Sequence, residues 1–251
     1  MQRSNIYIST IASDAPEVAR QYGFGIEIAE FCTARYIDDY FSKMDRTVRN
    51  KLKQIERRLL HAPFNELFPC AIDPKARQLA AFRYRQAIDL AKQYNATKVV
   101  VHSGYTPGVY YPSWYVQQSI LFWKDFLQDD SGIEIVLENV AETDPSWLIE
   151  IINGVNHPKL KLCMDIPHVN VYSDFPVVKW LEDSAPYISH FHIHNNDGKW
   201  DTHSPLDQGV LPMRDILERA NHLCPEATYT LETTQARSSA CWLEDNHFIE
   251  V

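Results

Sequence analysis

Short apolar segments alternate with longer segments of helical periodicity along nearly the whole chain. Several of the apolar segments are continuous runs of β-branched residues, such as Val99-Val100-Val101, which are typical of parallel strands covered on both faces. Eight segments are therefore predicted to be strands: Ile6–Ser9, Gly25–Ala29, Leu59–Ala62, Lys98–Ser103, Ile133–Asn139, Leu160–Asp165, Ile188–His194 and Thr228–Glu232.

The segments between these strands have the spacing of helices with one buried face. In Lys75–Tyr94, the residues Tyr84, Ile88 and Ala91 fall on a single stripe. Asp14, two residues before a proline, is predicted to be an N-cap. The predicted helices are Asp14–Tyr22, Lys75–Tyr94, Ser113–Gln128, Pro145–Asn153, Pro176–Ser184 and Met213–His222.

This order of elements predicts an α/β fold, a single (β/α)8 TIM barrel. Each connection is long enough for a right-handed crossover, and 251 residues is an ordinary length for such a barrel. No change of composition marks a linker, so one domain is expected over residues 1–251. Only 19 residues follow Glu232, which predicts a short or irregular last helix. A doubly wound open sheet is disfavoured because no Gly-rich phosphate loop follows the first strand.

Composition narrows the classes of function. The net charge of −9 and the lack of a Lys/Arg-rich run disfavour a nucleic-acid partner. The five cysteines are odd in number and far apart, with no C-x-x-C pair, which predicts reduced thiols and a cytoplasmic protein. No signal-peptide core and no apolar run of about 20 residues are present, so no membrane association is expected.

The predicted strands end on ionisable residues. Six strands close on His61, His102, Glu138, Asp165, His194 and Glu232. His168 follows three residues after Asp165, and Asp201 and His203 lie in the loop after the seventh strand. The C-terminal ends of barrel strands converge at one mouth, where catalytic residues of barrels are found. Nine such groups crowded together would be costly without cations, and mixed imidazole and carboxylate ligands suit Zn, Mn, Fe or Co.

Each of these residues also has a simpler interpretation. A single His at a strand end is more often hydrogen-bonded than a ligand, and Asp165 could cap the turn before Pro167. His192 shares the parity of His194 along the strand and is left out of the predicted site. It is the repetition at six successive strand ends that favours a metal site. The remaining histidines are interpreted as structural or surface residues: His157, His190, His222 and His247.

Three motifs resemble those of the xylose isomerase-like TIM barrels, a group that includes sugar-phosphate isomerases and epimerases and AP endonuclease family 2. They are Leu137-Glu138-Asn139, Asp165-Ile166-Pro167-His168, and the segment from His194 through Asp201 and His203 to Gly209. The resemblance runs from about Ile6 to Glu232. It implies a central metal site of Glu138, Asp165, His194 and Glu232, in which the two glutamates are also the acid/base pair.

The endonuclease branch of this group adds ligands for a three-zinc cluster, at positions that match His61, His102, His168, Asp201 and His203 here. The sequence departs from that branch in several ways, including the short chain after the eighth strand. The loop from His194 to Asp201 is shorter, the usual Gly-Glu-Gly reads Asp207-Gln208-Gly209, and DNA-gripping loops are not recognisable.

Three functions follow as hypotheses. The first is a divalent-metal-dependent isomerase or epimerase of a small sugar or sugar phosphate, with Glu138 and Glu232 catalytic and His168, His102 and Trp200 contacting the substrate. The second is a multi-zinc phosphoester hydrolase. The third is an inactive metal-binding barrel. One to three divalent ions per chain are expected, with Zn or Mn favoured, and the chain could form a homo-oligomer.

Overall fold

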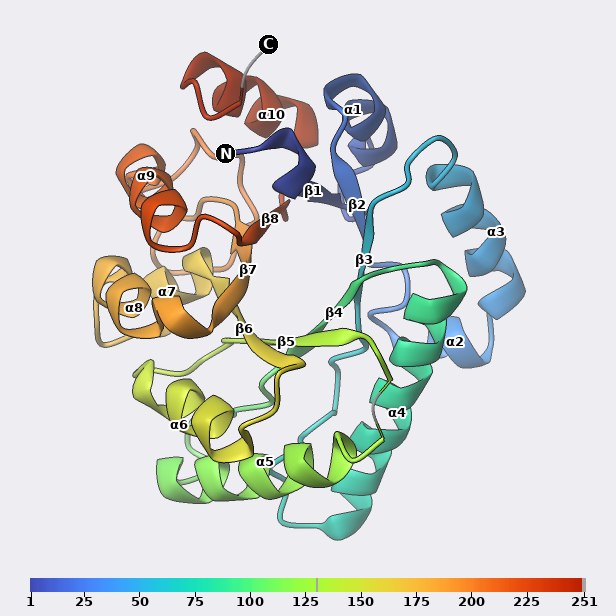
Figure 1. Ribbon diagram of the computed structural model, residues 1–251, viewed down its shortest axis with the longest axis vertical. Helices are drawn as coiled ribbons and strands as arrows, with labels where there is room; N and C mark the ends of the chain where they lie inside the picture. Colours follow the sequence, from blue (N-terminus) through green and yellow to red (C-terminus); the bar gives the residue numbers. More distant parts are fainter. Residues whose placement is uncertain (130, 250–251) are drawn as a thin grey trace.

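The computed structural model describes residues 1–129 and 131–249 (Figure 1). The domain expected over residues 1–251 therefore includes three positions, 130, 250 and 251, that lie outside the described residues. All of the predicted strands and helices lie within the described part.

Eight parallel strands close into a barrel in the order of the sequence, with β1 paired to both β2 and β8. Closure confirms the (β/α)8 barrel and rules out the doubly wound open sheet. Each predicted strand is present, and the bounds differ by at most one residue at either end. The strands are β1 Ile6–Ser9, β2 Gly25–Ile28, β3 Arg58–His61, β4 Lys98–His102, β5 Glu134–Glu138, β6 Leu160–Asp165, β7 Ile188–Ile193 and β8 Thr228–Leu231.

The helices form a ring around the outside of the barrel (Figure 1). They are α1 Ala15–Tyr22, α2 Ala34–Asp38, α3 Phe41–Lys51, α4 Pro74–Gln93, α5 Pro112–Phe126, α6 Ser146–Val155, α7 Ile166–Tyr172, α8 Val177–Ser184, α9 Met213–Leu223 and α10 Ala236–Asp245, with 3-10 turns η1 Arg3–Asn5 and η2 Ala185–Tyr187. The six predicted helices correspond to α1, α4, α5, α6, α8 and α9. The last helix, α10, is short at 10 residues, as expected.

Asp14 lies at the N-cap position of α1, as predicted, but its side chain has another partner. The Asp14 side chain makes no capping hydrogen bond to α1. Its carboxylate instead accepts hydrogen bonds from the backbone N–H groups of Ala236 and Arg237, at 3.2 and 3.0 Å, in the first turn of α10. The closed barrel brings α10 beside α1, so the acid stabilises the N-terminus of a helix more than 200 residues away.

Part of the barrel interior is apolar, and the mouth at the C-terminal ends of the strands is polar. Val100, Val136 and Cys163 form a small buried cluster of their own, apart from the main core between strands and helices. Inward-facing positions recur every second residue along a strand. His102, Glu138 and Asp165 are each two residues further along the same three strands, so they also face inward, at the mouth.

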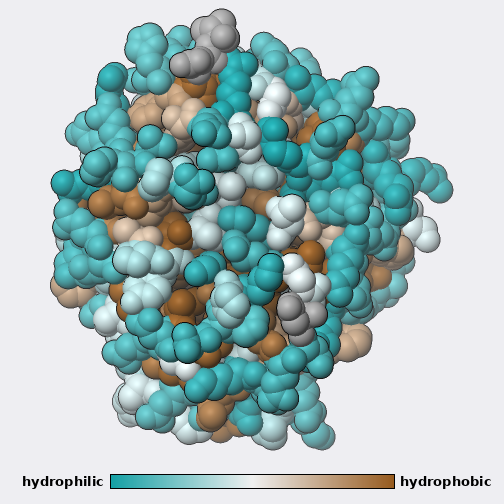
Figure 2. Space-filling view, in the orientation of Figure 1, coloured by the Kyte–Doolittle hydropathy of each residue, from teal (hydrophilic) through white to brown (hydrophobic). Residues whose placement is uncertain are grey.

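The outer surface is largely hydrophilic on the face shown in Figure 2, where apolar side chains lie in scattered patches. Among the described residues, no helix is both long and apolar enough to cross a membrane. The five cysteines, all of which are described, are free of disulfides.

Candidate metal centre

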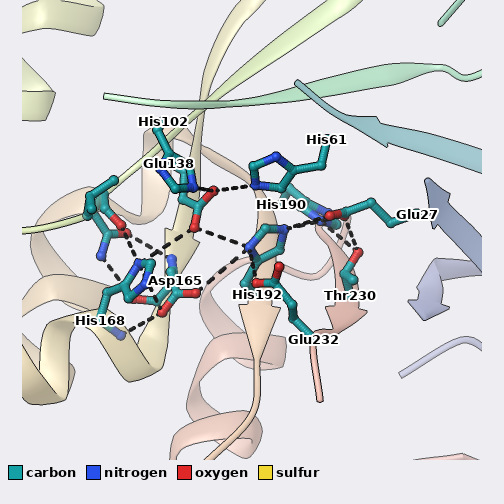
Figure 3. A network of polar contacts seen from close by, with 12 residues as sticks. Glu27, His61, His102, Glu138, Asp165, His168, His190, His192, Thr230 and Glu232 are labelled. Carbon is teal, nitrogen blue, oxygen red and sulfur yellow. Dashed lines mark hydrogen bonds and ion pairs between the residues drawn. The ribbon is translucent and has the colours of Figure 1, made fainter. Parts of the chain in front are cut away.

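The barrel mouth brings the predicted site residues together. His61, His102, Glu138 and Asp165 are the last residues of β3, β4, β5 and β6, and Glu232 directly follows β8. Figure 3 shows these side chains pointing toward one another from different strands. All but His102 are at least nine-tenths buried. Such a concentration of buried ionisable groups at one end of the barrel is typical of a functional site.

The central group consists of Glu138, Asp165, His192 and Glu232, each of which offers one ligand atom within 4.8 Å of the others. His192 Nδ1 lies 2.9 Å from Glu232 Oε2, 3.3 Å from Glu138 Oε1 and 3.8 Å from Asp165 Oδ2. One imidazole nitrogen thus faces three carboxylates, a donor set that suits a divalent transition-metal ion.

His192, which the sequence analysis left out of the site, stands in this group at the place that the resemblance implies for His194. The cause is strand register. Asp165 on β6 is paired with His192 on β7, after a register shift at Leu162 and Cys163. His194 is two residues further on, beyond the end of β7, and its Nε2 lies 3.8 Å from Asp165 Oδ2 and 3.4 Å from Asp201 Oδ1.

Two further groups of potential ligands adjoin the central one. The first joins His61 and His102 to Glu138, whose Oε2 lies 3.3 and 3.4 Å from their Nε2 atoms. The second consists of His194, Asp201 and His203. His203 Nε2 is 3.0 Å from Asp201 Oδ2, and its backbone has a left-handed φ of 47°, which is uncommon for a residue other than glycine.

His168 lies between the central group and the group of His194, Asp201 and His203. Its Nδ1 is 3.5 Å from Asp165 Oδ1 and 3.6 Å from Glu138 Oε1, and its Nε2 is 3.3 Å from Asp201 Oδ2. The residue is in the first turn of α7, whose N-cap is Asp165. Asp165 Oδ1 accepts from the His168 backbone N–H at 2.6 Å, so this aspartate is a helix cap and also belongs to the central group.

Four histidines of the site use the same hydrogen bond to orient their rings. The Nδ1 atoms of His61, His168, His194 and His203 donate to the backbone carbonyls of residues 62, 139, 195 and 232, at 2.8 to 3.2 Å. This bond leaves Nε2 directed at the acids. Hydrogen bonding of the remote ring nitrogen is a common feature of metal-binding histidines.

Several buried atoms at the mouth have no hydrogen-bond partner. They are Asp165 Oδ2, His192 Nδ1, His194 Nε2 and Asp201 Oδ1. Buried polar atoms are rarely left unpaired in folded proteins, and lone pairs of acids and imidazoles that face one another repel unless a cation lies between them. These residues therefore fit a divalent metal ion.

Burial and mutual charge shift the titration of these groups. Burial, together with the charges of Glu138 and Asp201, raises the pKa of Asp165 to about 7. Burial lowers the pKa of His194 to about 4, so its imidazole is neutral. Burial also opposes charge on His203, but Asp201 and Glu232 raise its pKa to about 9. A bound metal ion would therefore displace protons from these groups.

The structure reveals one buried acid that the sequence analysis missed, Glu27 on β2. It lies below the central group and contacts His190 and His192 (Figure 3). Burial alone would raise its pKa, but these two histidines hold the pKa well below the ordinary value. A charged residue inside the run Gly25-Ile26-Glu27-Ile28 was the sequence signal available.

The other residues singled out from the sequence lie outside the three groups around Glu138, Asp165 and Asp201, except His190, which adjoins His192. Trp200, which was expected to contact substrate, is 72% exposed in the loop after β7. His222 and His247 are exposed and His157 is half-buried, whereas His190 is buried within the barrel. Phe64, not predicted, stacks on His102 at a ring distance of 4.4 Å and forms one wall of the site.

The loop that carries Asp201 and His203 is held in place by Asn195. Asn195 Nδ2 donates to the carbonyls of Leu206 and Leu211, and Oδ1 accepts from two backbone N–H groups. A two-residue antiparallel bridge between Asn195 and Ser204 closes the loop. These bonds hold the loop against the end of β7, where it carries Asp201 and His203.

The sequence matches the xylose isomerase-like TIM barrel family over residues 16–247. It is also similar to two uncharacterised proteins of Methanocaldococcus jannaschii. One is 28% identical over 72% of this chain and 66% of its own length, and the other is 26% identical over 61% of each chain. The chain thus spans slightly less than two thirds of the length of these relatives.

Solved structures resemble the fold across nearly the whole chain. A D-tagatose 3-epimerase-like protein has a TM-score of 0.79 at 23% identity, covering 97% of both chains. A Thermus thermophilus protein, solved after soaking with ZnCl2, has a TM-score of 0.78 at 24% identity over 96% of this chain and 97% of the other. A D-psicose 3-epimerase from Clostridium cellulolyticum, solved with D-tagatose, has a TM-score of 0.70 at 14% identity over 90% and 83%.

Proposed function

Because the chain belongs to the xylose isomerase-like TIM barrel family, we propose that it is a divalent-metal-dependent isomerase or epimerase of a small sugar or sugar phosphate. The observation that carries the proposal is the central group, in which Glu138 and Glu232 approach the same nitrogen of His192. Two of the similar structures are named for sugar epimerases, and one of them was solved with a sugar.

In this proposal Glu138, Asp165, His192 and Glu232 hold the ion. The ion would polarise the carbonyl of a bound sugar and acidify the adjacent C–H. Glu138 and Glu232 then divide the proton transfer, since one carboxylate takes the proton from carbon and the other returns a proton to the opposite face. Burial of both side chains excludes the bulk water that would otherwise compete for that proton.

Substrate contacts are proposed at the rim of the site. His102, which is held against Phe64, and His168, which is fixed by its bond to the Asn139 carbonyl, are placed to hydrogen-bond with sugar hydroxyls. Trp200 is exposed beside Asp201, and its indole is the apolar surface on which a sugar ring could stack.

A phosphoester hydrolase is the second candidate, and the two adjoining ligand groups favour it. A single-ion isomerase has no need of His61, His194, Asp201 and His203 as ligands. Two or three ions held side by side by the adjoining groups would bind a phosphate and activate water. The net charge of −9 favours a small phosphorylated substrate over duplex DNA.

The first prediction separates these functions. Protein loaded with Mn²⁺ or Zn²⁺ is incubated in D2O with a panel of ketoses, aldoses and their phosphates, and deuterium in the sugars is measured by mass spectrometry. We expect exchange with the wild-type protein and a loss of about 10²–10⁴-fold in Glu138→Gln and Glu232→Gln, the range typical of general acid–base groups.

The control is Glu142→Gln, which alters a buried acid outside the ligand groups whose carboxylate accepts from the Tyr115 hydroxyl. It should retain exchange. If metal-loaded protein puts deuterium into none of the sugars but hydrolyses phosphoesters, the protein is a phosphoester hydrolase, the second candidate. Absence of both activities in metal-loaded protein would favour the inactive metal-binding barrel.

A further inference from the structure

A buried acid lies directly beneath the proposed metal centre. Glu27 is fully buried on β2, and its Oε1 and Oε2 lie 3.2 and 3.3 Å from His192 Nε2. In His192, the ring nitrogen that points away from the central group contacts a carboxylate (Figure 3). In His61, His168, His194 and His203, the corresponding nitrogen contacts a backbone carbonyl. The contact joins β2 to β7, which are not neighbours in the barrel.

The hydrogen bonds around Glu27 define which atom carries the proton. Thr230 Oγ1 donates to Glu27 Oε2 at 2.6 Å, and His190 Nε2 lies 3.3 Å from the same oxygen and 3.0 Å from Thr230 Oγ1. A carboxylate surrounded by donors acts only as an acceptor. His192 therefore donates Nε2–H to Glu27, and its Nδ1 faces Glu138, Asp165 and Glu232.

We propose that Glu27 is a positioning residue of the metal centre: it fixes the Nε2–H tautomer and the ring orientation of His192 so that Nδ1 is a metal ligand. The inference deepens the proposed function and depends on its metal centre. An anionic acceptor also makes Nδ1 more basic than a neutral carbonyl would, which strengthens the bond to metal. Thr230 and His190 in turn hold Glu27 in place.

A rival arrangement uses the same residues as ligands. Cys163, His190 and His192 form a further group whose potential ligand atoms lie within 4.8 Å of one another, beside Glu27. An ion bound there would compete for His192 with the central group, and it would displace the proton that His192 shares with Glu27. The register fits both arrangements, since it pairs His192 with Asp165 and His190 with Cys163. The positioning role is favoured by the contacts of His192 Nδ1, which lies 2.9 Å from Glu232 Oε2 and 3.3 Å from Glu138 Oε1.

The second prediction concerns metal affinity, measured with the full chain and Mn²⁺ or Zn²⁺ alone. We expect Glu27→Gln to weaken binding of the central ion by about 10–100-fold, the range for residues that orient metal ligands. The visible spectrum of Co²⁺-substituted protein should change with it, because the geometry at His192 Nδ1 relaxes. Glu142→Gln, a buried acid outside the ligand groups, and Cys163→Ser should bind as the wild type does.

The outcomes distinguish the positioning role of Glu27 from the metal centre on which that role depends. Wild-type affinity in Glu27→Gln overturns the positioning role and leaves the metal centre intact, whereas a wild-type protein that binds no ion overturns both. Loss of an ion in Cys163→Ser supports the rival site and overturns the positioning role. Should Glu27→Gln not fold, ¹⁵N NMR of His192 in metal-loaded wild type decides the matter: a protonated Nε2 is expected, and metal bound at Nε2 would contradict the proposal.

Discussion

At the scale of single residues, the site is organised by which nitrogen each histidine presents. His61, His168, His194 and His203 donate Nδ1–H to backbone carbonyls and present Nε2. His192 presents Nδ1. A histidine that presents the wrong nitrogen brings a hydrogen atom where a lone pair is needed, so these remote hydrogen bonds decide which rings can bind metal.

The third prediction tests whether His192, and not His194, is the histidine ligand of the central ion. His192→Ala should weaken binding of the central ion by at least about 100-fold, because loss of a direct ligand should exceed the effect of losing a residue that only orients one. His194→Ala should leave the central ion bound and weaken the ion held with Asp201 and His203. Metal stoichiometry by elemental analysis, with dissociation constants from chelator competition, measures both. The reverse pattern would restore the assignment made from the sequence.

At the scale of elements, the loop after β7 depends on a close backbone approach at Gly209. A Cβ atom there would lie 2.1 Å from Asn195 Oδ1 and 2.5 Å from the Asn196 carbonyl oxygen. Asn195 cannot move aside, because its side chain makes four hydrogen bonds that hold the loop. Glycine is therefore required for the loop to carry Asp201 and His203 over the barrel mouth.

The fourth prediction follows from this contact. Gly209→Ala should displace the loop and reduce metal binding at His194, Asp201 and His203, while the central ion remains. The matched control is Gln208→Ala, which alters an exposed neighbour of Gly209. Metal content per chain is the measurement. Full metal content in Gly209→Ala would show that the loop tolerates the added methyl group.

At the scale of the whole molecule, the barrel concentrates repelling groups at one end of its interior. Glu138, Asp165 and Glu232 meet there, each supplied by a different strand. Their mutual repulsion and desolvation oppose closure of the barrel. An ion that binds only the folded chain offsets this cost, so metal binding should stabilise the fold as a whole.

The fifth prediction is a shift in thermal unfolding. An ion present at 100 times its Kd should raise the free energy of unfolding by about 2.7 kcal/mol. For a chain of this size that corresponds to a rise in Tm of roughly 5–10 °C. Calorimetry with Mn²⁺ or Zn²⁺, against chelator-treated protein, measures the shift, and His192→Ala should reduce it. An unchanged Tm at saturating metal would contradict binding at this centre.

The pattern of side chains along the chain by itself determined the barrel, its eight strands and the positions of most site residues. Strand propensity and polarity are local properties, and the C-terminal ends of parallel strands must meet at one mouth, so His61, His102, Glu138, Asp165 and Glu232 could be assigned without coordinates.

Only the tertiary structure decided the assignments that depend on partners far apart in sequence. The proposal of His192 in place of His194 as the central ligand rests on the register of β6 with β7, which includes a shift that no local pattern encodes. Glu27 gains its role from His192 across the barrel, and Asp14 caps α10 because closure brings that helix beside α1. Local sequence records which groups are present, but contacts between distant strands determine which atoms meet.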